Sequence, residues 1–175
     1  MLELMILYLL IKRDLTMYSI QKHIKENFGA YTCPSFGAIK PALVRLEKQN
    51  FITSSKIMSE GGKLSIYYSI TNDGTKAIAT MLLQPISPNP LQFLSDARIK
   101  LSCLSVLESD ERYNVFEDIK ANAQLHKANA ENILNNEYTD LNFYQKVVLD
   151  NAICEYKNFI TLIENLEKEN GRNSK

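Results

Sequence analysis

Apolar positions recur at intervals of three and four residues along most of this chain, which predicts a mainly helical protein. An apolar stretch over residues 2–11 predicts a first helix, and a second pattern runs from residue 16 or 17 to 28. The third predicted helix starts at Ser35, a preferred N-cap residue, and reaches about Gln49. Its apolar positions lie on one side, as expected for a helix that packs against a core.

Between residues 51 and 71 the apolar period changes to two, which predicts strands rather than helices. Gly61 and Gly62 supply a turn between two such runs, so this segment is predicted to form a β-hairpin. Asn72 or Asp73 is expected to cap a fourth helix that runs to about Leu82. Three helices followed by a hairpin, in this order, are typical of a winged helix-turn-helix.

The segment LQPISPNP, residues 83–90, contains three prolines and predicts a semi-rigid linker over 84–90. The pattern after it is all helical, so we expect a second, helical domain over 91–170 after a winged-helix domain over 1–83. Its long, narrow apolar stripes favour pairing between two chains. A helical hairpin packed on its own first domain is the alternative. The predicted dimerisation residues are Leu94, Leu101, Leu104, Phe116, Ile119, Ile133, Val148, Tyr156, Phe159, Ile163 and Leu166.

Charge changes this picture, because a formal net charge of zero hides an asymmetry between the two halves. Residues 1–83 carry ten basic and six acidic side chains, a net charge of +4, whereas residues 84–175 carry ten and fourteen, a net charge of −4. Such a division predicts a first half that faces a polyanion and a second half that faces protein or solvent.

The sequence offers little for an enzyme. No Gly-rich nucleotide loop, nucleophile elbow or zinc-protease motif occurs, and with only two histidines and three scattered cysteines we expect no cofactor, metal site or disulfide. His126 lies on an apolar helical stripe and is predicted to be a buried or interfacial structural histidine. The apolar start is too short to span a bilayer and lacks a basic region and a cleavage site, so we expect a cytoplasmic protein.

DNA binding agrees better with these features. A recognition helix enters the major groove by its N-terminal residues, and its free N–H groups favour phosphate. A wheel of the third helix places one set of side chains opposite the apolar face, and Lys56 and Lys63 flank the tip of the hairpin, the wing. The candidate DNA contacts on the helix and wing are Ser35, Phe36, Gly37, Lys40, Pro41, Val44, Lys56 and Lys63.

Pro41 lies inside this helical pattern, four residues after Gly37. A proline there removes the hydrogen bond to the carbonyl of residue 37 and clashes with it, and glycine shifts its backbone most easily. Both residues are predicted to face outward, so the disturbed turn points at a groove rather than at the core. A helix that starts nearer Ala38, with Pro41 in its first turn, is the rival interpretation.

Residues 2–82 resemble the PadR family of bacterial transcriptional regulators, through LMILYLLIKRDLTMYSIQKHI, PSFGAIKPALVRLEKQNFI and GGKLSIYYSITNDG. The resemblance implies a homodimeric winged-helix repressor that binds a pseudo-palindromic operator in double-stranded DNA. Carried over by position, it implies that Tyr18, Ser35, Gly37 and Lys63 approach the DNA. Lys40 stands where the family usually has tyrosine, and Met17 where it usually has glycine.

Two matters stay open at this stage. The alternative function is a helical oligomerisation or protein-interaction module whose winged helix no longer binds DNA, which the sparse positive charge and Glu60 in the wing keep available. The sequence does not imply a small-molecule effector, because aromatic residues at helical spacing are usually core or interface, and it implies no membrane partner.

Overall fold

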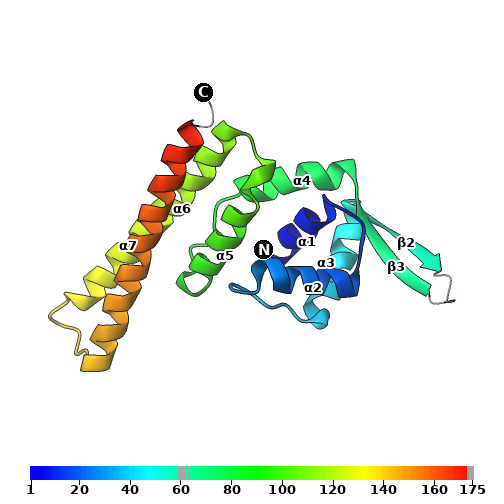
Figure 1. The fold of residues 1–175 in the computed structure, drawn as a ribbon. Helices are drawn as coiled ribbons and strands as arrows, with labels where there is room; N and C mark the ends of the chain where they lie inside the picture. Colours follow the sequence, from blue (N-terminus) through cyan, green and yellow to red (C-terminus); the bar gives the residue numbers. More distant parts are fainter. Residues whose placement is uncertain (59–61, 63, 173–175) are drawn as a thin grey trace. The chain divides into compact units, whose positions relative to one another are not determined.

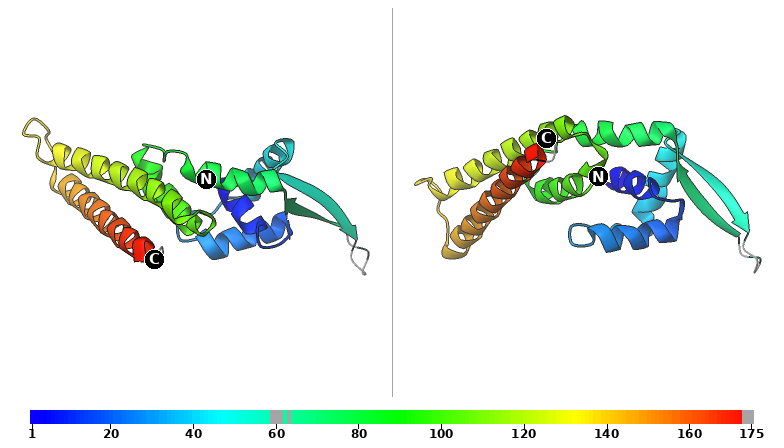
Figure 2. Two further views of the ribbon diagram at one scale, coloured as in Figure 1. Left: turned by 90° about the horizontal axis from the view of Figure 1, so that it is seen from above. Right: turned by 45° about the horizontal axis from the view of Figure 1, so that its top comes forward.

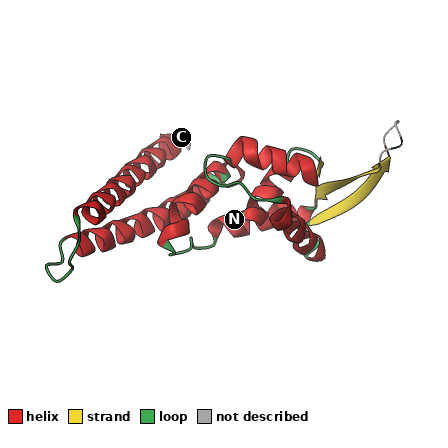
Figure 3. Cartoon of the chain, turned by 90° about the horizontal axis from the view of Figure 1, so that it is seen from below, coloured by secondary structure: helices red, strands yellow, loops and turns green. Residues whose placement is uncertain are grey.

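In the computed structural model, residues 1–58, 62 and 64–172 are described, and they are mainly helical with one small sheet (Figure 3). This confirms the predicted fold class. The chain divides into two compact units. The first comprises Met1–Gln84 with Leu94–Val106, and the second comprises Pro85–Phe93 with Leu107–Lys175. The predicted boundary at residues 84–90 stays a prediction, and residues 94–106 fall in the first unit.

The first unit contains the predicted three helices, hairpin and fourth helix in the expected order (Figure 1). A short additional strand precedes the second helix, and the short helix η1 ends the unit. Its elements are α1 (Leu2–Leu10), β1 (Leu15–Thr16), α2 (Met17–Phe28), α3 (Phe36–Lys48), β2 (Ile52–Met58), β3 (Leu64–Ile70), α4 (Asn72–Leu83) and η1 (Leu104–Val106). Helix α5 (Pro90–Ser102) begins in the second unit and continues into the first.

Helix α1 is the centre of the first unit. Its sequence is apolar on nearly every side, and it contacts α2, α3, α4 and β3. A helix that is apolar all round is stable in water only when other elements surround it. Helices α2, α3 and α4 therefore each present an apolar face to α1, and that requirement fixes which of their side chains point outward.

The sheet is antiparallel with strand order β1-β3-β2, so β3 is central and β2 lies at an edge. Strand β1 pairs only Leu15 and Thr16 with Tyr68 and Tyr67 at the base of the hairpin. Beyond that point the hairpin is a two-stranded ribbon, which extends past the helices of its unit (Figure 2).

The N-cap of α4 is Thr71, which lies just before Asn72 and Asp73, the two predicted cap residues. The Thr71 hydroxyl accepts a hydrogen bond from the Gly74 N–H at 2.9 Å and donates one to the Asn50 carbonyl at 2.7 Å. Gly74 is buried, and a Cβ at this position would overlap the Phe51 carbonyl oxygen. The start of α4 is thereby held directly against the chain that enters the hairpin.

Lys100 of α5 is almost fully buried, with 1% of its surface exposed. Its ammonium donates to the Leu82 carbonyl at 2.9 Å and to the Gln84 carbonyl. The last carbonyls of a helix lack partners within the helix and favour a cation nearby. Lys100 therefore supplies the C-terminal cap of α4, which explains a buried charge that the sequence pattern did not reveal.

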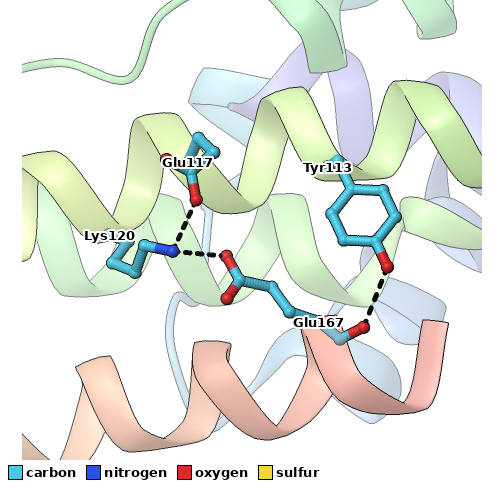
Figure 4. Close-up of polar contacts among 4 residues, drawn as sticks. All are labelled: Tyr113, Glu117, Lys120 and Glu167. Atoms are coloured by element: carbon cyan, nitrogen blue, oxygen red, sulfur yellow. Dashed lines mark hydrogen bonds and ion pairs between the residues drawn. The ribbon is translucent and has the colours of Figure 1, made fainter. Parts of the chain in front are cut away.

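The second unit is built on α6 (Ser109–Leu134) and α7 (Phe143–Arg172), which pack along each other. Figure 4 shows the polar contacts at one end, where the Lys120 ammonium lies 2.7 Å from Glu167 and 2.5 Å from Glu117. Hydrogen bonds to these carboxylates raise the pKa of Lys120, and the bond to Lys120 lowers the pKa of Glu117. The stabilisation is therefore present near neutral pH and is lost in acid, as Glu117 is protonated, and in strong alkali, as Lys120 is neutralised.

His126 packs against two aromatic rings in the interior of this unit and is 6% exposed, which confirms that it is a buried residue. Its ring centroid is 4.9 Å from that of Phe93 and 5.6 Å from that of Tyr156. Burial lowers the pKa of His126, so the neutral imidazole is favoured. Its Nε2 atom has no hydrogen-bond partner among the residues that the structure describes.

The predicted dimerisation residues have different exposures in a single chain. Leu104, Phe116, Ile119, Tyr156, Phe159 and Ile163 are buried, whereas Ile133 and Val148 are exposed and Leu94, Leu101 and Leu166 are half-buried. The α6–α7 contact accounts for much of the apolar stripe without a second chain. None of the described helices is both long and apolar enough to cross a membrane.

Gly74→Ala is expected to lower the free energy of unfolding by about 1–3 kcal/mol, because the new methyl group must push α4 away from the Phe51 carbonyl. The matched control is Gly37→Ala, also within a helix, where the added Cβ meets only the Ser35 hydroxyl oxygen at 3.5 Å. The control should raise stability by about 0.5–1 kcal/mol. Urea unfolding of both variants tests the pair, and equal effects would contradict the close approach at Gly74.

Candidate nucleic-acid interface

Helix α3 has two clearly different faces. Ile39, Ala42, Leu43 and Leu46 are at most 1% exposed and form part of the core of the first unit. The residues on the opposite side are exposed, and these are Gly37, Lys40, Pro41, Val44 and Lys48. The predicted division of this helix into a core face and an outward face is confirmed.

The N-terminal turn of α3 is open to an external partner. Ser35 occupies the predicted N-cap position, but its side chain makes no capping hydrogen bond. The Ala38 and Ile39 N–H groups donate to the Ser35 carbonyl at 3.0 and 3.1 Å. No acceptor among the described residues takes the N–H groups of Phe36 and Gly37. These exposed donors, at the positive end of a helix, suit an anionic oxygen.

Gly37 and Pro41 lie on this outward face, and α3 begins at Phe36, so Pro41 is in its second turn. The alternative of a helix that starts nearer Ala38 is therefore wrong. Pro41 has no N–H to donate to the Gly37 carbonyl, so this carbonyl lacks its usual helical partner. Because the space beside Gly37 is open, packing within the chain does not require a glycine there.

An aromatic pair connects the first turns of α2 and α3. The rings of Tyr18 and Phe36 are stacked, with centroids 6.3 Å apart and an interplanar angle of 21°. Tyr18 is 70% exposed, so its ring and hydroxyl are available at the surface. Helix α2 starts here because Thr16 accepts the Ser19 N–H at 3.2 Å. The predicted contacts Tyr18, Phe36 and Gly37 thus lie at adjacent helix starts.

A depression of about 420 Å³ lies beside this pair and has a basic lining. It is lined by Tyr18, Gln21, Lys22, Lys25, Cys33 and Pro34. Lys22 also forms an exposed ion pair with Glu26 at 3.8 Å, so the Glu26 carboxylate partly offsets the positive charge of Lys22. Lys40 has no ion-pair partner among the described residues, so its charge is available to a phosphate.

The wing has a different character from α3. Lys56 is exposed on β2, as predicted, whereas Lys63 and Glu60 lie outside the described residues. The sequence reasoning did not identify Met58, Leu64 and Ile66 as candidates, although they are 68%, 54% and 43% exposed. The alternation of this hairpin could have revealed them, because they continue the face that begins with the buried Ile52.

The structure thus places the helix candidates and Tyr18 on the surface of one unit, and Lys56 on its wing. Val44 is 58% exposed on α3, four residues after Lys40. Arg45, which was not a candidate, instead joins α3 to α1 through a 2.6 Å ion pair with Glu3. The role of each candidate in DNA binding stays a prediction.

Comparison with known proteins bears on this region directly. Residues 6–80 match the Transcriptional regulator PadR-like family. The chain is also 27% identical to the negative transcriptional regulator PadR of Bacillus subtilis strain 168, over 92% of both proteins.

Solved structures with a similar course of the chain come from the same family. A crystal structure of Bacillus subtilis PadR in complex with operator DNA is 22% identical, with a TM-score of 0.45, over 97% of this chain and 98% of that one. A PadR family transcription regulator from Clostridium difficile R20291 is 29% identical, with a TM-score of 0.41, over 46% of this chain and 81% of that one.

The family match spans α2, α3 and the wing, and the similarity to the Bacillus relative extends over nearly the whole length of both proteins. Residues 6–80 therefore match a family of transcriptional regulators, and the chain over most of its length is similar to a negative regulator of that family.

Proposed function

We propose that this chain is a cytoplasmic, homodimeric repressor that binds a pseudo-palindromic operator through α3 and the wing. The observation that carries the proposal is the N-terminal turn of α3, where open N–H groups, Gly37 and the Lys40 ammonium share one exposed surface. A helix presented in this way enters the major groove by its first residues. The Bacillus relative is a negative regulator, which favours repression over activation.

The contacts divide by chemistry. Lys40 and the Phe36 and Gly37 N–H groups face phosphate, and such contacts position the protein without reading sequence. Val44, one turn further along the same face, is placed to contact a thymine methyl group. Tyr18 adds a phenol at the start of α2, beside the basic depression. Lys56 extends the positive surface onto the wing.

The homodimer in this proposal is supported by an apolar surface that one chain leaves uncovered in its second unit. Phe143, Tyr144 and Val148 are 72%, 77% and 67% exposed along the first turns of α7. A depression of about 430 Å³ lies here, lined by Leu141, Asn142, Tyr144, Gln145, Val148 and Leu149. Clustered apolar surface of this kind marks an interaction site. A second copy covers it, and a two-fold dimer matches a pseudo-palindromic operator.

A mobility-shift titration against duplex from the protein's own upstream region tests the proposal. Binding should be at least about a thousandfold tighter than to random duplex at physiological salt. Ordered dimers that show no preference for the upstream duplex would instead indicate an oligomerisation or protein-interaction module without DNA binding.

Lys40→Ala is expected to weaken binding similarly for all sequences and to lower the slope of log K against log salt by about one, if its ammonium neutralises one phosphate. Lys76→Ala removes the same charge from an exposed position on α4 and should leave the slope unchanged. Fluorescence anisotropy at several salt concentrations measures both. An unchanged slope for Lys40→Ala removes this residue from the contacts.

Gly37→Ala is expected to weaken operator binding by roughly tenfold, or about 1.4 kcal/mol, because the new methyl group occupies the space that the DNA backbone approaches. The same variant is expected to be no less stable than the unmodified protein, so the loss cannot come from unfolding. Affinity and urea unfolding are measured on one preparation. Unchanged affinity would show that the backbone at residue 37 does not approach DNA closely.

Val148→Asp is expected to weaken the dimer by about a hundredfold or more, because an unpaired carboxylate would be buried against apolar side chains. Thr161→Asp adds the same charge at another exposed position of α7. The side chains of residues 148 and 161 leave the helix in directions that differ by more than a third of a turn, so this variant should leave the dimer intact. Sedimentation equilibrium distinguishes the two variants. A dimer that tolerates Val148→Asp would place the interface elsewhere.

A further inference from the structure

The outer half of the wing has an apolar face that no described residue of its unit covers. Met58 stands opposite Leu64 and Lys56 opposite Ile66, so these four side chains share one face of the two-stranded ribbon. Single exposed apolar residues are ordinary on protein surfaces, whereas a contiguous group indicates a partner. Figures 1 and 2 show that the outer part of the two-stranded ribbon lies beyond the helices of the unit.

This face is a direct continuation of the core. Nearer the base of the hairpin it contains Ile52, which is 1% exposed, and Ser54, whose hydroxyl donates to Glu47 of α3 at 2.5 Å. Tyr68 lies opposite Ser54, and burial, together with the Glu47 charge, raises its pKa. The apolar surface of the outer wing therefore lies on the side of the sheet that faces α3.

The composition and size of the face decide which partner it suits. The described residues of β2 and β3 include no carboxylate, and their single charged side chain is that of Lys56. A polyanion fits this charge. Three apolar side chains are too few for an independent protein interface, which buries about 800 Å² on each partner. A narrow ribbon can instead lie along a nucleic-acid groove and insert apolar side chains as one part of a larger contact.

We propose that Met58, Leu64 and Ile66 form an apolar wedge that enters the minor groove next to the major groove occupied by α3. The proposal rests on the proposed function, since α3 must bring the wing to the duplex. Apolar side chains inserted from the minor groove partly unstack base steps and bend the duplex. The wing thereby selects DNA by the ease with which its sequence deforms, while Lys56 contacts the adjacent backbone.

The test uses the full-length protein and an upstream duplex with 2-aminopurine at the base steps that flank the α3 half-site. Binding of the unmodified protein should increase 2-aminopurine fluorescence, because unstacking relieves quenching. Met58→Ser with Leu64→Ser should abolish this increase and weaken binding by about tenfold or more, since two apolar side chains lose their buried surface. The salt slope of this double variant should not change, whereas Lys56→Ala should lower it by about one.

The matched control is Ile57→Ser, which removes an apolar side chain of 50% exposure from the opposite face of the same strand. It should change neither fluorescence nor affinity. Met58→Leu keeps the face apolar and should retain binding, which separates loss of the wedge from damage to the hairpin.

Three results would overturn the wedge. In the first, the unmodified protein binds its upstream duplex specifically and the double serine variant binds it equally well. This result contradicts the wedge and leaves the proposed function intact. In the second, the double serine variant loses its dimer in light scattering, which would identify the face as a contact between copies. If the unmodified protein binds no duplex specifically, the proposed function fails and the wedge fails with it.

Discussion

The burial of one face of α3 is the interaction on which the rest of the interface depends. Ile39, Leu43 and Leu46 are essentially inaccessible, and they pack in a unit centred on the apolar helix α1. Because side chains leave a helix in fixed directions, anchoring this face also determines where Gly37 and Lys40 point. The Glu3–Arg45 ion pair adds a second connection between α1 and α3. The candidate contacts on α3 itself are therefore held by the core, and they do not depend on a loop for their position.

The burial of one face of α3 also explains why the helix tolerates a proline. Pro41 removes a backbone hydrogen bond from the second turn, which would be costly if the freed Gly37 carbonyl were buried. Here both residues are exposed, so water or a ligand can satisfy the carbonyl. The core face of the helix continues through this turn without interruption, with Ile39 and Ala42 fully buried on either side of Pro41. The irregular turn is thus tolerated because it lies on the surface that faces away from α1.

The sequence was sufficient to predict most elements, because long apolar stripes and the two-residue period of the hairpin leave few alternatives. The sequence did not predict the features that depend on contacts between elements distant in the chain. Strand β1 has only two residues and forms because β3 offers a free edge, and Lys100 is buried because α4 ends beside it. Thr71 replaces the predicted caps through its contact with the distant Asn50 carbonyl. On α6 and α7, apolar spacing alone cannot distinguish a partner helix in the same chain from one in a second chain, so Phe116 and Val148 looked alike although only Val148 is exposed.

The two parts of the candidate interface differ in their physics. Helix α3 offers a charge and open N–H groups, and contacts of this type weaken steeply as salt displaces the released counterions. The described strands of the wing offer apolar side chains and the lysine Lys56, and burial of apolar surface does not depend on counterion release. A regulator that combined both would retain part of its discrimination at salt concentrations where its electrostatic contacts are weak. The modest positive charge of the first unit is then no obstacle to specific binding, because a share of the selectivity would come from the shape and deformability of the duplex.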